Sequence, residues 1–347
     1  MFALSVGCPS GIGPEVSVRA LAEDGGRDVL LVGDFDVIVR AVENAGQDRS
    51  VHRVHADAVS SAAALARATK GDALFVYQPG RTLAEDERVL GKPSAEGGRA
   101  QLQWVNAACE LARAGVTSGM ITGPVSKEAV VRGGGKGFIG HTEHLARLCG
   151  VRDVTMAFAT ESFTSALVTT HIALADVPRA VTARRVATTI VHLARFLATV
   201  SRKKRPRVVV SGLNPHAGEN GQFGREELTR IIPAMTQAAA TLEGAVTLLG
   251  PLPVEHAFRL AQKGSVDGVV AMYHDQATLA MKLLSFGEAV NVTLGLPIVR
   301  TSVDHGTAYD LAPHCGADPA GMVGALVLAR RMTKRGAPVR AGRASTR

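Results

Sequence analysis

The stretch Val208-Val-Val-Ser-Gly-Leu-Asn-Pro-His-Ala-Gly-Glu219 joins a β-branched run to a polar turn rich in glycine, asparagine and proline. A short, wholly apolar run of this kind is typical of a buried strand in a parallel sheet. Because ligands of open α/β sheets bind beyond the carboxyl ends of the strands, we expect the functional site in such turns. Three further stretches have the same form: Met120–Lys127 (MITGPVSK), Val168–Ala173 (VTTHIA) and Val270–Gln276 (VAMYHDQ).

Along the rest of the chain, short apolar runs alternate with segments in which apolar residues recur at helical spacing, which predicts a layered α/β protein. The length of 347 residues is typical of two domains. The predicted strands are Val29–Val32, Met120–Thr122, Ala166–Thr170, Val208–Ser211 and Gly268–Met272, and the predicted helices include Ala100–Ala114, Val181–Val200 and a segment from Glu226 to about Ala240.

The composition, with 46% hydrophobic and 20% charged residues, is that of a compact enzyme. The formal net charge is +8, but seven basic residues and no acidic residue lie from Arg330 to the end, so the excess belongs largely to a polar tail. Neither this tail nor the basic run at 202–207 carries aromatic side chains on which bases could stack. We therefore expect no nucleic-acid partner.

The sequence also indicates where the protein resides. It shows no basic segment followed by an apolar signal core at its start, and no apolar stretch approaches the roughly 18 residues that span a bilayer. Its four cysteines are widely spaced and form no CxxC pair, which favours free thiols in a reducing compartment. We expect a cytoplasmic protein that has no membrane partner.

Two nucleotide-binding motifs can be set aside. Gly135-Lys-Gly-Phe-Ile-Gly140 matches the GxGxxG pattern, but a helix-like segment precedes it where a dinucleotide fingerprint requires a strand. No GxxxxGK[ST] sequence is present, which excludes P-loop kinases.

Three histidines follow apolar runs in the same manner: His171, His216 and His274. Each could be a structural residue, and for one histidine alone that is the better interpretation. Parallel strands, however, would bring three imidazoles to one edge of a sheet. Three nitrogen ligands with an open position are typical of a catalytic divalent-metal site.

Lys282 and Arg300 are cations within apolar, glycine-rich chain near the C-terminus. A phosphate or carboxylate of an anionic substrate would suit them, because arginine presents a planar fork and lysine a point charge. An internal salt bridge to Asp or Glu is an equally good explanation.

The chain resembles the 4-hydroxythreonine-4-phosphate dehydrogenase family, the pyridoxal-phosphate biosynthesis enzyme and its D-threonate and D-erythronate 4-phosphate dehydrogenase relatives. Any one of the shared motifs is weak, but ten of them in order across nearly the whole chain are very specific. These motifs are SGIGPE, ITGPVSK, GHTE, TTH, GLNPHAGE, IIP, GPLP, MYHDQ, NVTLGLP and RTSVDHGTA.

The resemblance implies an isocitrate/isopropylmalate-dehydrogenase-like fold of two α/β/α domains with a cleft between them. The first domain is expected at 1–125 plus 290–347, with a basic flexible tail after about 332, and the second at 126–289. The resemblance also implies a homodimer whose active site draws on both subunits.

Carried over by motif, the metal ligands fall on the three histidines named above. The substrate contacts fall on His141, Thr142, Lys282, Asn291 and Arg300. The cofactor, NAD or NADP, is expected near His305, Gly306, Thr307 and Ala308, which explains why no GxGxxG fingerprint is needed. The resemblance is compatible with one zinc, cobalt or magnesium ion per site, since imidazoles suit the first two and the family also tolerates the third.

The implied reaction is an NAD-linked oxidation of 4-hydroxy-L-threonine 4-phosphate, followed by loss of carbon dioxide to give 3-amino-2-oxopropyl phosphate. The metal would stabilise first the alkoxide and then the enolate. The near alternative is a D-threonate or D-erythronate 4-phosphate dehydrogenase of sugar-acid catabolism. A more distant one is a protein that binds phosphorylated ligands without turnover.

Four positions depart from the family pattern and leave the choice of phosphorylated four-carbon substrate open. Cys8 stands where an acidic residue is common, and His144 replaces an aromatic residue after GHTE. Glu255 and His256 follow GPLP where Ala-Asp-Thr is usual, so Glu255 would reach about one methylene further than the aspartate. The altered residues also motivate the alternative of a protein without turnover.

Overall fold

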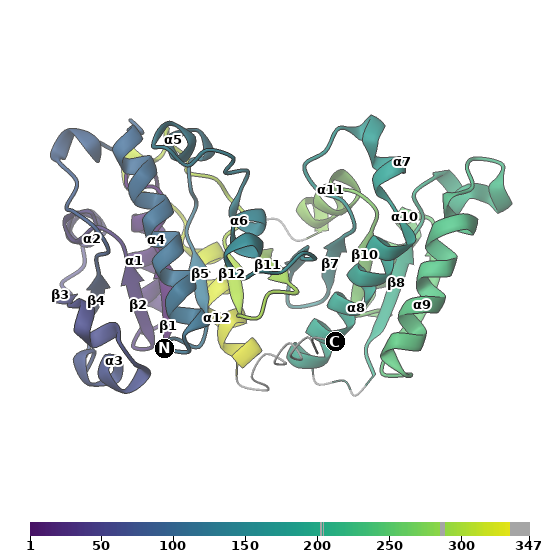
Figure 1. Ribbon diagram of the computed structural model, residues 1–347, viewed down its shortest axis with the longest axis horizontal. Coiled ribbons are helices and arrows are strands. Elements are labelled where there is room, and N and C mark those ends of the chain that lie inside the picture. Colours follow the sequence, from purple (N-terminus) through teal and green to yellow (C-terminus); the bar gives the residue numbers. More distant parts are fainter. Residues whose placement is uncertain (202, 204, 285–288, 334–347) are drawn as a thin grey trace, which may run out of the picture. The chain divides into compact units, whose positions relative to one another are not determined.

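A computed structural model describes residues 1–201, 203, 205–284 and 289–333 (Figure 1). The chain forms two compact units: unit 1 comprises Met1–Arg152 and the chain from Leu296 on, and unit 2 comprises Asp153–Gly295. The predicted division into domains at 125/126 and 289/290 stays a prediction. It differs from the two units in that residues 126–152 belong to unit 1. Most of the predicted basic tail lies outside the described residues.

Unit 1 contains a wholly parallel sheet in the order β3-β4-β2-β1-β5-β12. Its central strands are buried along their whole length, as expected where helices cover both faces. The strands are β1 (Phe2–Ser5), β2 (Val29–Val32), β3 (Val51–Val54), β4 (Leu74–Tyr77), β5 (Met120–Thr122) and β12 (Arg300–Ser302).

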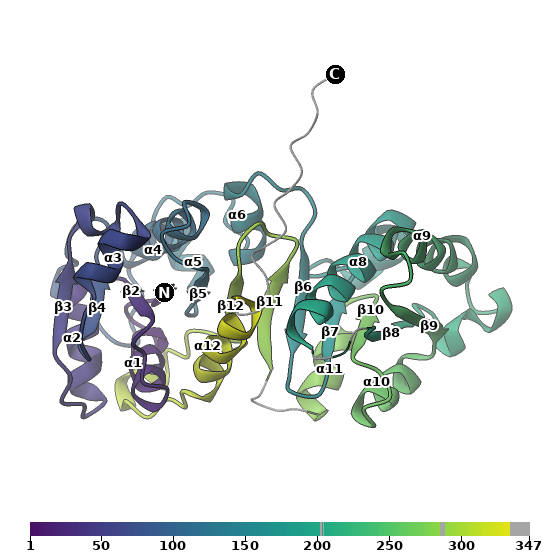
Figure 2. The same ribbon diagram turned by 90° about the horizontal axis from the view of Figure 1, so that it is seen from below.

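The helices of unit 1 lie on both faces of this sheet, with α1, α2 and α12 on one side and α4 and α5 on the other (Figure 2). Asp34 caps α2 and Ser94 caps α4 by accepting from the backbone three residues on. The helices are α1 (Gly13–Glu23), α2 (Phe35–Asn44), α3 (Ala62–Ala68), α4 (Ala95–Arg113), α5 (Lys127–Arg132), α6 (His141–Leu148) and α12 (Ala320–Thr333).

Unit 2 has a mixed sheet in the order β11-β6-β7-β10-β8-β9. The strands β7, β10, β8 and β9 pair in parallel, whereas β11 and β6 each pair in antiparallel fashion. The strands are β6 (Thr155–Ala159), β7 (Thr164–Leu167), β8 (Arg207–Ser211), β9 (Thr247–Leu252), β10 (Gly268–Ala271) and β11 (Val290–Leu294).

Helices α8 and α9 cover one face of this sheet, and α10 and α11 cover the other (Figure 2). Phe158, Phe163 and Phe258 belong to the apolar core between the sheet and α10 and α11. The helices are α7 (Val177–Ala180), α8 (Ala183–Val200), α9 (Ile232–Leu242), α10 (Val254–Gln262) and α11 (His274–Leu284), with a π-helical turn at Glu227–Ile231 before α9. In the described part of the chain, no helix has the length and apolar character that crossing a membrane requires.

The α/β fold class predicted from the sequence is confirmed, although two elements begin earlier than expected. Helix α4 starts at Ala95 and not at Ala100, because the hydroxyl of Ser94 accepts from the Gly97 amide at 2.9 Å and supplies the cap. Strand β7 starts at Thr164, whose amide donates to Asp267. Apolar periodicity alone does not reveal either start.

Candidate active site

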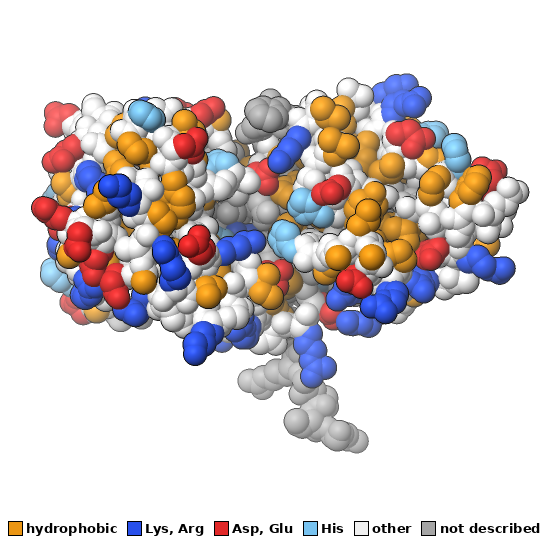
Figure 3. Space-filling model, turned by 90° about the horizontal axis from the view of Figure 1, so that it is seen from above, with side chains coloured by type: hydrophobic (Ala, Val, Ile, Leu, Met, Phe, Trp, Pro, Cys, Tyr) orange, Lys and Arg blue, Asp and Glu red, His pale blue; other side chains and the backbone are white. Residues whose placement is uncertain are grey.

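The three histidines predicted to bind metal follow β7, β10 and β8, which are neighbours in the sheet of unit 2. Because these strands are parallel, their carboxyl ends lie at one edge. We call this the histidine edge: the turns after β7, β10 and β8 that carry His171, His274 and His216. Figure 3 shows histidines beside a group of hydrophobic side chains on the right-hand part of the surface.

At the histidine edge, His171 and His274 lie together, with ring centroids 5.6 Å apart. Both line a pocket of about 150 Å³ with Thr170 and Tyr273. The Nδ1 atom of His274 is 2.7 Å from a carboxylate oxygen of Asp275. Within the described ranges, no group of three or more His, Cys, Asp or Glu side chains is close enough to hold a metal, so all three metal ligands stay predictions. The imidazole pair is nevertheless the donor chemistry that a divalent zinc or cobalt ion prefers.

His216 lies in an unusual backbone conformation. Residues 216–220 all have positive φ, from 41° at Glu219 to 80° at Gly218, although only Gly218 is a glycine. Each non-glycine residue in this left-handed region costs about 1–2 kcal/mol. Strain of this kind persists only where surrounding contacts impose it, and it is concentrated at functional sites.

Glu227 supplies those contacts from the π-helical turn that precedes α9. Its carboxylate is buried and accepts from the amides of Leu213 and Asn214, both at 2.8 Å, and from the Asn214 side chain at 3.0 Å. A Cβ atom on Gly218 would lie 2.6 Å from this carboxylate. Glu227 therefore holds the turn that presents His216, a role that the sequence prediction missed.

Two further side chains tie the three histidine turns together. The amide of Gln276 accepts from the Met272 backbone at 2.8 Å and donates to the Gly212 carbonyl at 3.1 Å, which joins the turn after β10 to the turn after β8. The hydroxyl of Thr169 donates to the Met272 carbonyl at 2.8 Å and joins the turn after β7. Gln276 belongs to the MYHDQ motif, so its position was a signal that the prediction did not use.

The other predicted site residues of unit 2 lie on three elements. Lys282 is exposed on α11, the helix that begins at His274, and Asn291 is half-buried on β11 opposite Phe158. Glu255 and His256 are exposed in the first turn of α10, just after β9.

In unit 1, His141 and Thr142 form the first turn of α6. The Nε2 atom of His141 is buried and has no hydrogen-bond partner among the described residues. Burial, together with the positive charge of Arg300, holds the pKa of His141 well below its usual range. The imidazole is therefore neutral near pH 7, and its buried nitrogen is available to a ligand.

Arg300, at the start of β12, is 2% exposed. Its Nη2 donates to the Thr122 hydroxyl at 2.8 Å. Burial lowers the pKa of its guanidinium to about 9, and the charge of Glu143 acts in the opposite direction. A buried cation of this kind is stabilised by an anionic group, which fits the predicted substrate contact.

His144, one of the four departures from the family pattern, makes contacts within unit 1. Its Nε2 lies 2.6 Å from the Asn106 side-chain oxygen on α4, and its ring packs 5.3 Å from that of Phe138. Burial lowers its pKa. In this arrangement His144 fastens α6 to α4.

The predicted cofactor loop, 305–308, packs against the turn after β1. The Thr307 carbonyl accepts from the Ile12 amide at 3.0 Å, and a Cβ atom on Gly11 would lie 2.6 Å from it. The Cys8 amide likewise donates to Pro124 at 2.8 Å. We call this the glycine edge: the turns 7–13, 123–126 and 303–309 after β1, β5 and β12.

The thiol of Cys8 contacts the Tyr309 hydroxyl at 3.3 Å. Burial raises the pKa of Cys8, and burial together with the neighbouring thiol raises the pKa of Tyr309 to about 12. The side chains of Ser126 and Thr307 act in the opposite direction on the pKa of Tyr309, so this side chain is influenced by residues from all three turns of the glycine edge.

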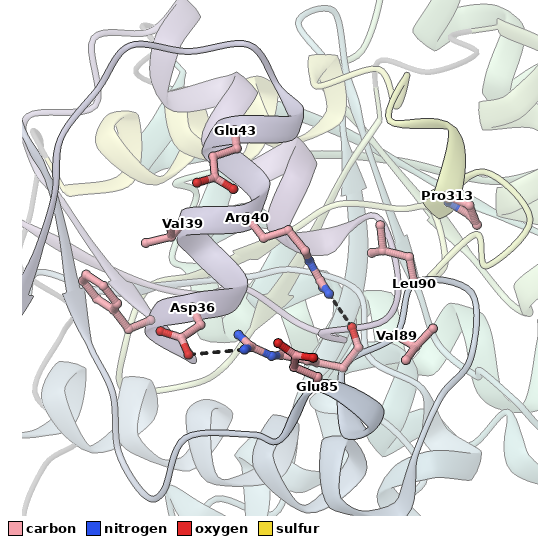
Figure 4. Close-up of a pocket in the computed structure, with 10 residues that line it drawn as sticks. Asp36, Val39, Arg40, Glu43, Glu85, Val89, Leu90 and Pro313 are labelled. Carbon is pink, nitrogen blue, oxygen red and sulfur yellow. Dashed lines mark hydrogen bonds and ion pairs between the residues drawn. The ribbon is translucent and has the colours of Figure 1, made fainter.

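Unit 1 also contains an open pocket of about 630 Å³ between α2 and the segment 85–90 (Figure 4). Its cations are already engaged: Arg40 donates to the carbonyls of Arg88 and Pro9, and Arg88 pairs with Asp36 at 3.3 Å. Both guanidinium groups that line the pocket therefore already have partners, and neither is available to bind an anion.

The fold is that of an α/β enzyme, and most of its predicted site residues lie at or near the carboxyl ends of parallel strands in these two edges. The chain belongs to the family described as "Pyridoxal phosphate biosynthetic protein PdxA", whose model matches residues 26–329. The family resemblance identified from the sequence is thereby confirmed.

Two curated relatives are similar over most of the chain. A 4-hydroxythreonine-4-phosphate dehydrogenase from Geobacter metallireducens is 41% identical over 95% of both chains. A D-threonate 4-phosphate dehydrogenase from Salmonella typhimurium is 39% identical over 89% of this chain and 92% of that one. The crystal structure of a 4-hydroxythreonine-4-phosphate dehydrogenase from Klebsiella pneumoniae matches with a TM-score of 0.82 and 34% identity, covering 96% of this chain and 98% of that one. The protein is thus an oxidoreductase.

Proposed function

We propose that the protein oxidises 4-hydroxy-L-threonine 4-phosphate with NAD and releases carbon dioxide and 3-amino-2-oxopropyl phosphate, a step of pyridoxal 5′-phosphate biosynthesis. Family membership together with the His171–His274 pair at the histidine edge carries this proposal. The relatives named for this activity support the substrate.

In the proposed site, His171, His216 and His274 hold one divalent ion, which we expect to be zinc, cobalt or magnesium. The donor set supports this assignment, because neutral imidazoles at the ends of adjacent parallel strands can converge on one ion. When bound, the ion would polarise the substrate oxygen and the nicotinamide would take up the hydride. Glu227 and Gln276 keep the three turns in register.

The anionic groups of the substrate would be bound by Arg300 and Lys282. Arg300 is held rigidly in a buried position, so an anion that pairs with it is also oriented. Neutral His141 would donate or accept a hydrogen bond at its buried Nε2, next to Thr142. We propose that Asn291 contacts a polar group of the same substrate and that Glu255 and His256 adjust the choice of substrate.

The cofactor is proposed to bind at the glycine edge, along His305, Gly306, Thr307 and Ala308. The close backbone approaches at Gly11 and Thr307 support this assignment, since glycine lets a chain come near a ligand's phosphates.

D-Threonate 4-phosphate is the second candidate substrate, and D-erythronate 4-phosphate its near relative. The chain is 39% identical to the Salmonella typhimurium enzyme named for D-threonate 4-phosphate and 41% identical to the Geobacter metallireducens enzyme named for 4-hydroxythreonine 4-phosphate. Sequence identity therefore supports the second candidate substrate almost as well as it supports the first. Cys8, His144, Glu255 and His256 are the positions at which this chain departs from the family pattern.

The proposed assembly is a cytoplasmic homodimer. Exposed Leu174, Leu279 and Leu283 of unit 2, at 70%, 63% and 77% exposure, support association, because large apolar side chains at a surface favour burial against a partner.

The deciding experiment is a panel of phosphorylated four-carbon hydroxy acids, assayed by NAD reduction before and after exhaustive chelation. We expect 4-hydroxy-L-threonine 4-phosphate to give the highest kcat/KM and chelation to abolish the rate. A higher kcat/KM with D-threonate or D-erythronate 4-phosphate would show that the protein is a dehydrogenase of sugar-acid catabolism. Full activity after chelation would refute the metal site, and binding of every compound without turnover would refute the enzyme.

A further inference from the structure

Two of the four cysteines, although 40 residues apart in the sequence, meet in unit 1. The sulfur atoms of Cys109 and Cys149 are 3.9 Å apart. Cys109 lies on the buried side of α4, and Cys149 is the half-buried residue that ends α6. This contact is not explained by the proposed reaction, which uses neither thiol.

We propose that Cys109 and Cys149 form a redox-active dithiol, a modification site that low-molecular-weight disulfides oxidise to an intramolecular disulfide bond. The sulfur atoms need to approach by about 2 Å, since a disulfide bond measures about 2.0 Å. This distance is within reach of a side-chain rotation combined with a small shift of α6.

The half-buried thiol is the attacking group. The hydrogen bond from Cys109 and the charge of Arg113 lower the pKa of Cys149, whereas the pKa of Cys109 is raised. The Cys149 thiolate displaces one thiolate from the small disulfide and forms a mixed disulfide. The Cys109 sulfur then loses its proton, attacks the Cys149 sulfur and expels the second thiol, so one small disulfide is reduced for each protein disulfide formed.

The same helix connects this pair to the proposed substrate residues. Helix α6 begins with His141 and Thr142 and ends at Leu148, directly before its capping residue Cys149. Between these points His144 fastens the helix to Asn106 on α4. Drawing the C-terminal end of α6 toward α4 displaces a rigid helix of about two turns and with it the first turn. Oxidation is therefore expected to weaken substrate binding.

The test equilibrates the full-length protein with mixtures of oxidised and reduced glutathione, followed by alkylation of free thiols and non-reducing peptide mapping. We expect one cross-linked peptide pair joining Cys109 to Cys149, which dithiothreitol reverses. NAD reduction with the substrate that the panel identifies is expected to fall about tenfold or more in kcat/KM upon oxidation, mainly through KM.

Matched variants locate the effect. In Cys149→Ser and, separately, Cys109→Ala, glutathione no longer changes the activity, whereas Cys315→Ser, which removes another half-buried thiol, behaves as the wild type does. Absence of the cross-linked pair across the whole range of glutathione ratios overturns the proposal, as does a disulfide that leaves kcat/KM unchanged. The expected fall in kcat/KM on oxidation rests on the proposed function, but the peptide map does not. If the protein turned over none of the substrates, the peptide map would still test whether Cys109 and Cys149 form a disulfide.

Discussion

The histidine edge and the glycine edge are both built at the carboxyl ends of three adjacent parallel strands, but they are held together differently. At the glycine edge, backbone groups meet directly, as where Ile12 donates to Thr307 and Cys8 donates to Pro124. At the histidine edge, the turns after β7 and β10 share one backbone bond, from the Thr169 amide to the Met272 carbonyl, and side chains supply the remaining links. Gln276 joins the turns after β10 and β8, and Glu227 holds the turn after β8.

This difference follows from what each edge presents. Close backbone packing requires glycine at several positions, because a Cβ atom at Gly7 or Gly11 would overlap the backbone of the neighbouring turn. Presenting imidazoles requires the opposite: turns that hold bulky side chains outward, even in the left-handed region at residues 216–220. On the proposed assignment, the metal ligands depend on supporting side chains and the nucleotide site depends on a lack of side chains.

The largest expected effect is at the histidine edge. His216→Ala should lose bound metal and lower kcat by about a thousandfold or more, because a metal's stabilisation of developing charge is worth several kcal/mol. Metal content by mass spectrometry and NAD reduction are the two measurements. His55→Ala, which removes an exposed histidine of unit 1, serves as the control. Metal retained at one per subunit would show that His216 is not a ligand.

Glu227→Gln tests whether supporting side chains hold that edge. The amide cannot accept all the bonds that the carboxylate accepts, so the free energy of unfolding should fall by about 1–3 kcal/mol and metal affinity should fall with it. Chemical denaturation and metal titration measure the two effects. Glu226→Gln makes the same charge change at a carboxylate that accepts a single bond from the Asn214 side chain, and it should cost less. Equal losses in both variants would contradict the role of Glu227.

Gly11→Ala tests the glycine edge. The added Cβ would lie 2.6 Å from the Thr307 carbonyl, so the cofactor loop must shift, and KM for the nucleotide should rise about tenfold. Gly316→Ala is the control, since its Cβ would meet nothing nearer than 3.9 Å. An unchanged KM for the nucleotide, with an intact fold, would remove the proposed cofactor loop from this edge.

The smallest effect concerns His141. The unfolded chain binds a proton at this imidazole below about pH 6.5, whereas the folded protein keeps it neutral, so stability falls as the pH drops below that value. His141→Gln lacks this titration and should lose less stability toward pH 5, with a slope lower by at most about 1.4 kcal/mol per pH unit. Denaturation at several pH values measures the slope. A slope equal to that of the wild type would show that His141 titrates normally.

Much of the arrangement was predictable because it depends on local pattern. The runs around Val208 and Gly268 were correctly predicted as strands, and the three histidine turns lie at strand ends as predicted. These predictions succeed because the alternation of apolar runs and helical segments depends on residues that are close together in the sequence. The ordered motifs also identified the family. The ligand, substrate and cofactor roles of individual residues stay predictions.

What the sequence by itself determined is therefore the layered α/β class and the strand ends at which chemistry is expected. Only the tertiary structure revealed the bonds of Glu227 and Gln276, the left-handed turn at His216 and the meeting of Cys109 with Cys149. The physical reason is that secondary structure follows from interactions between near neighbours. The bonds of Glu227 to Asn214 and of Gln276 to Gly212, and the contact of Cys109 with Cys149, join residues that are 13, 64 and 40 positions apart, which only packing brings together.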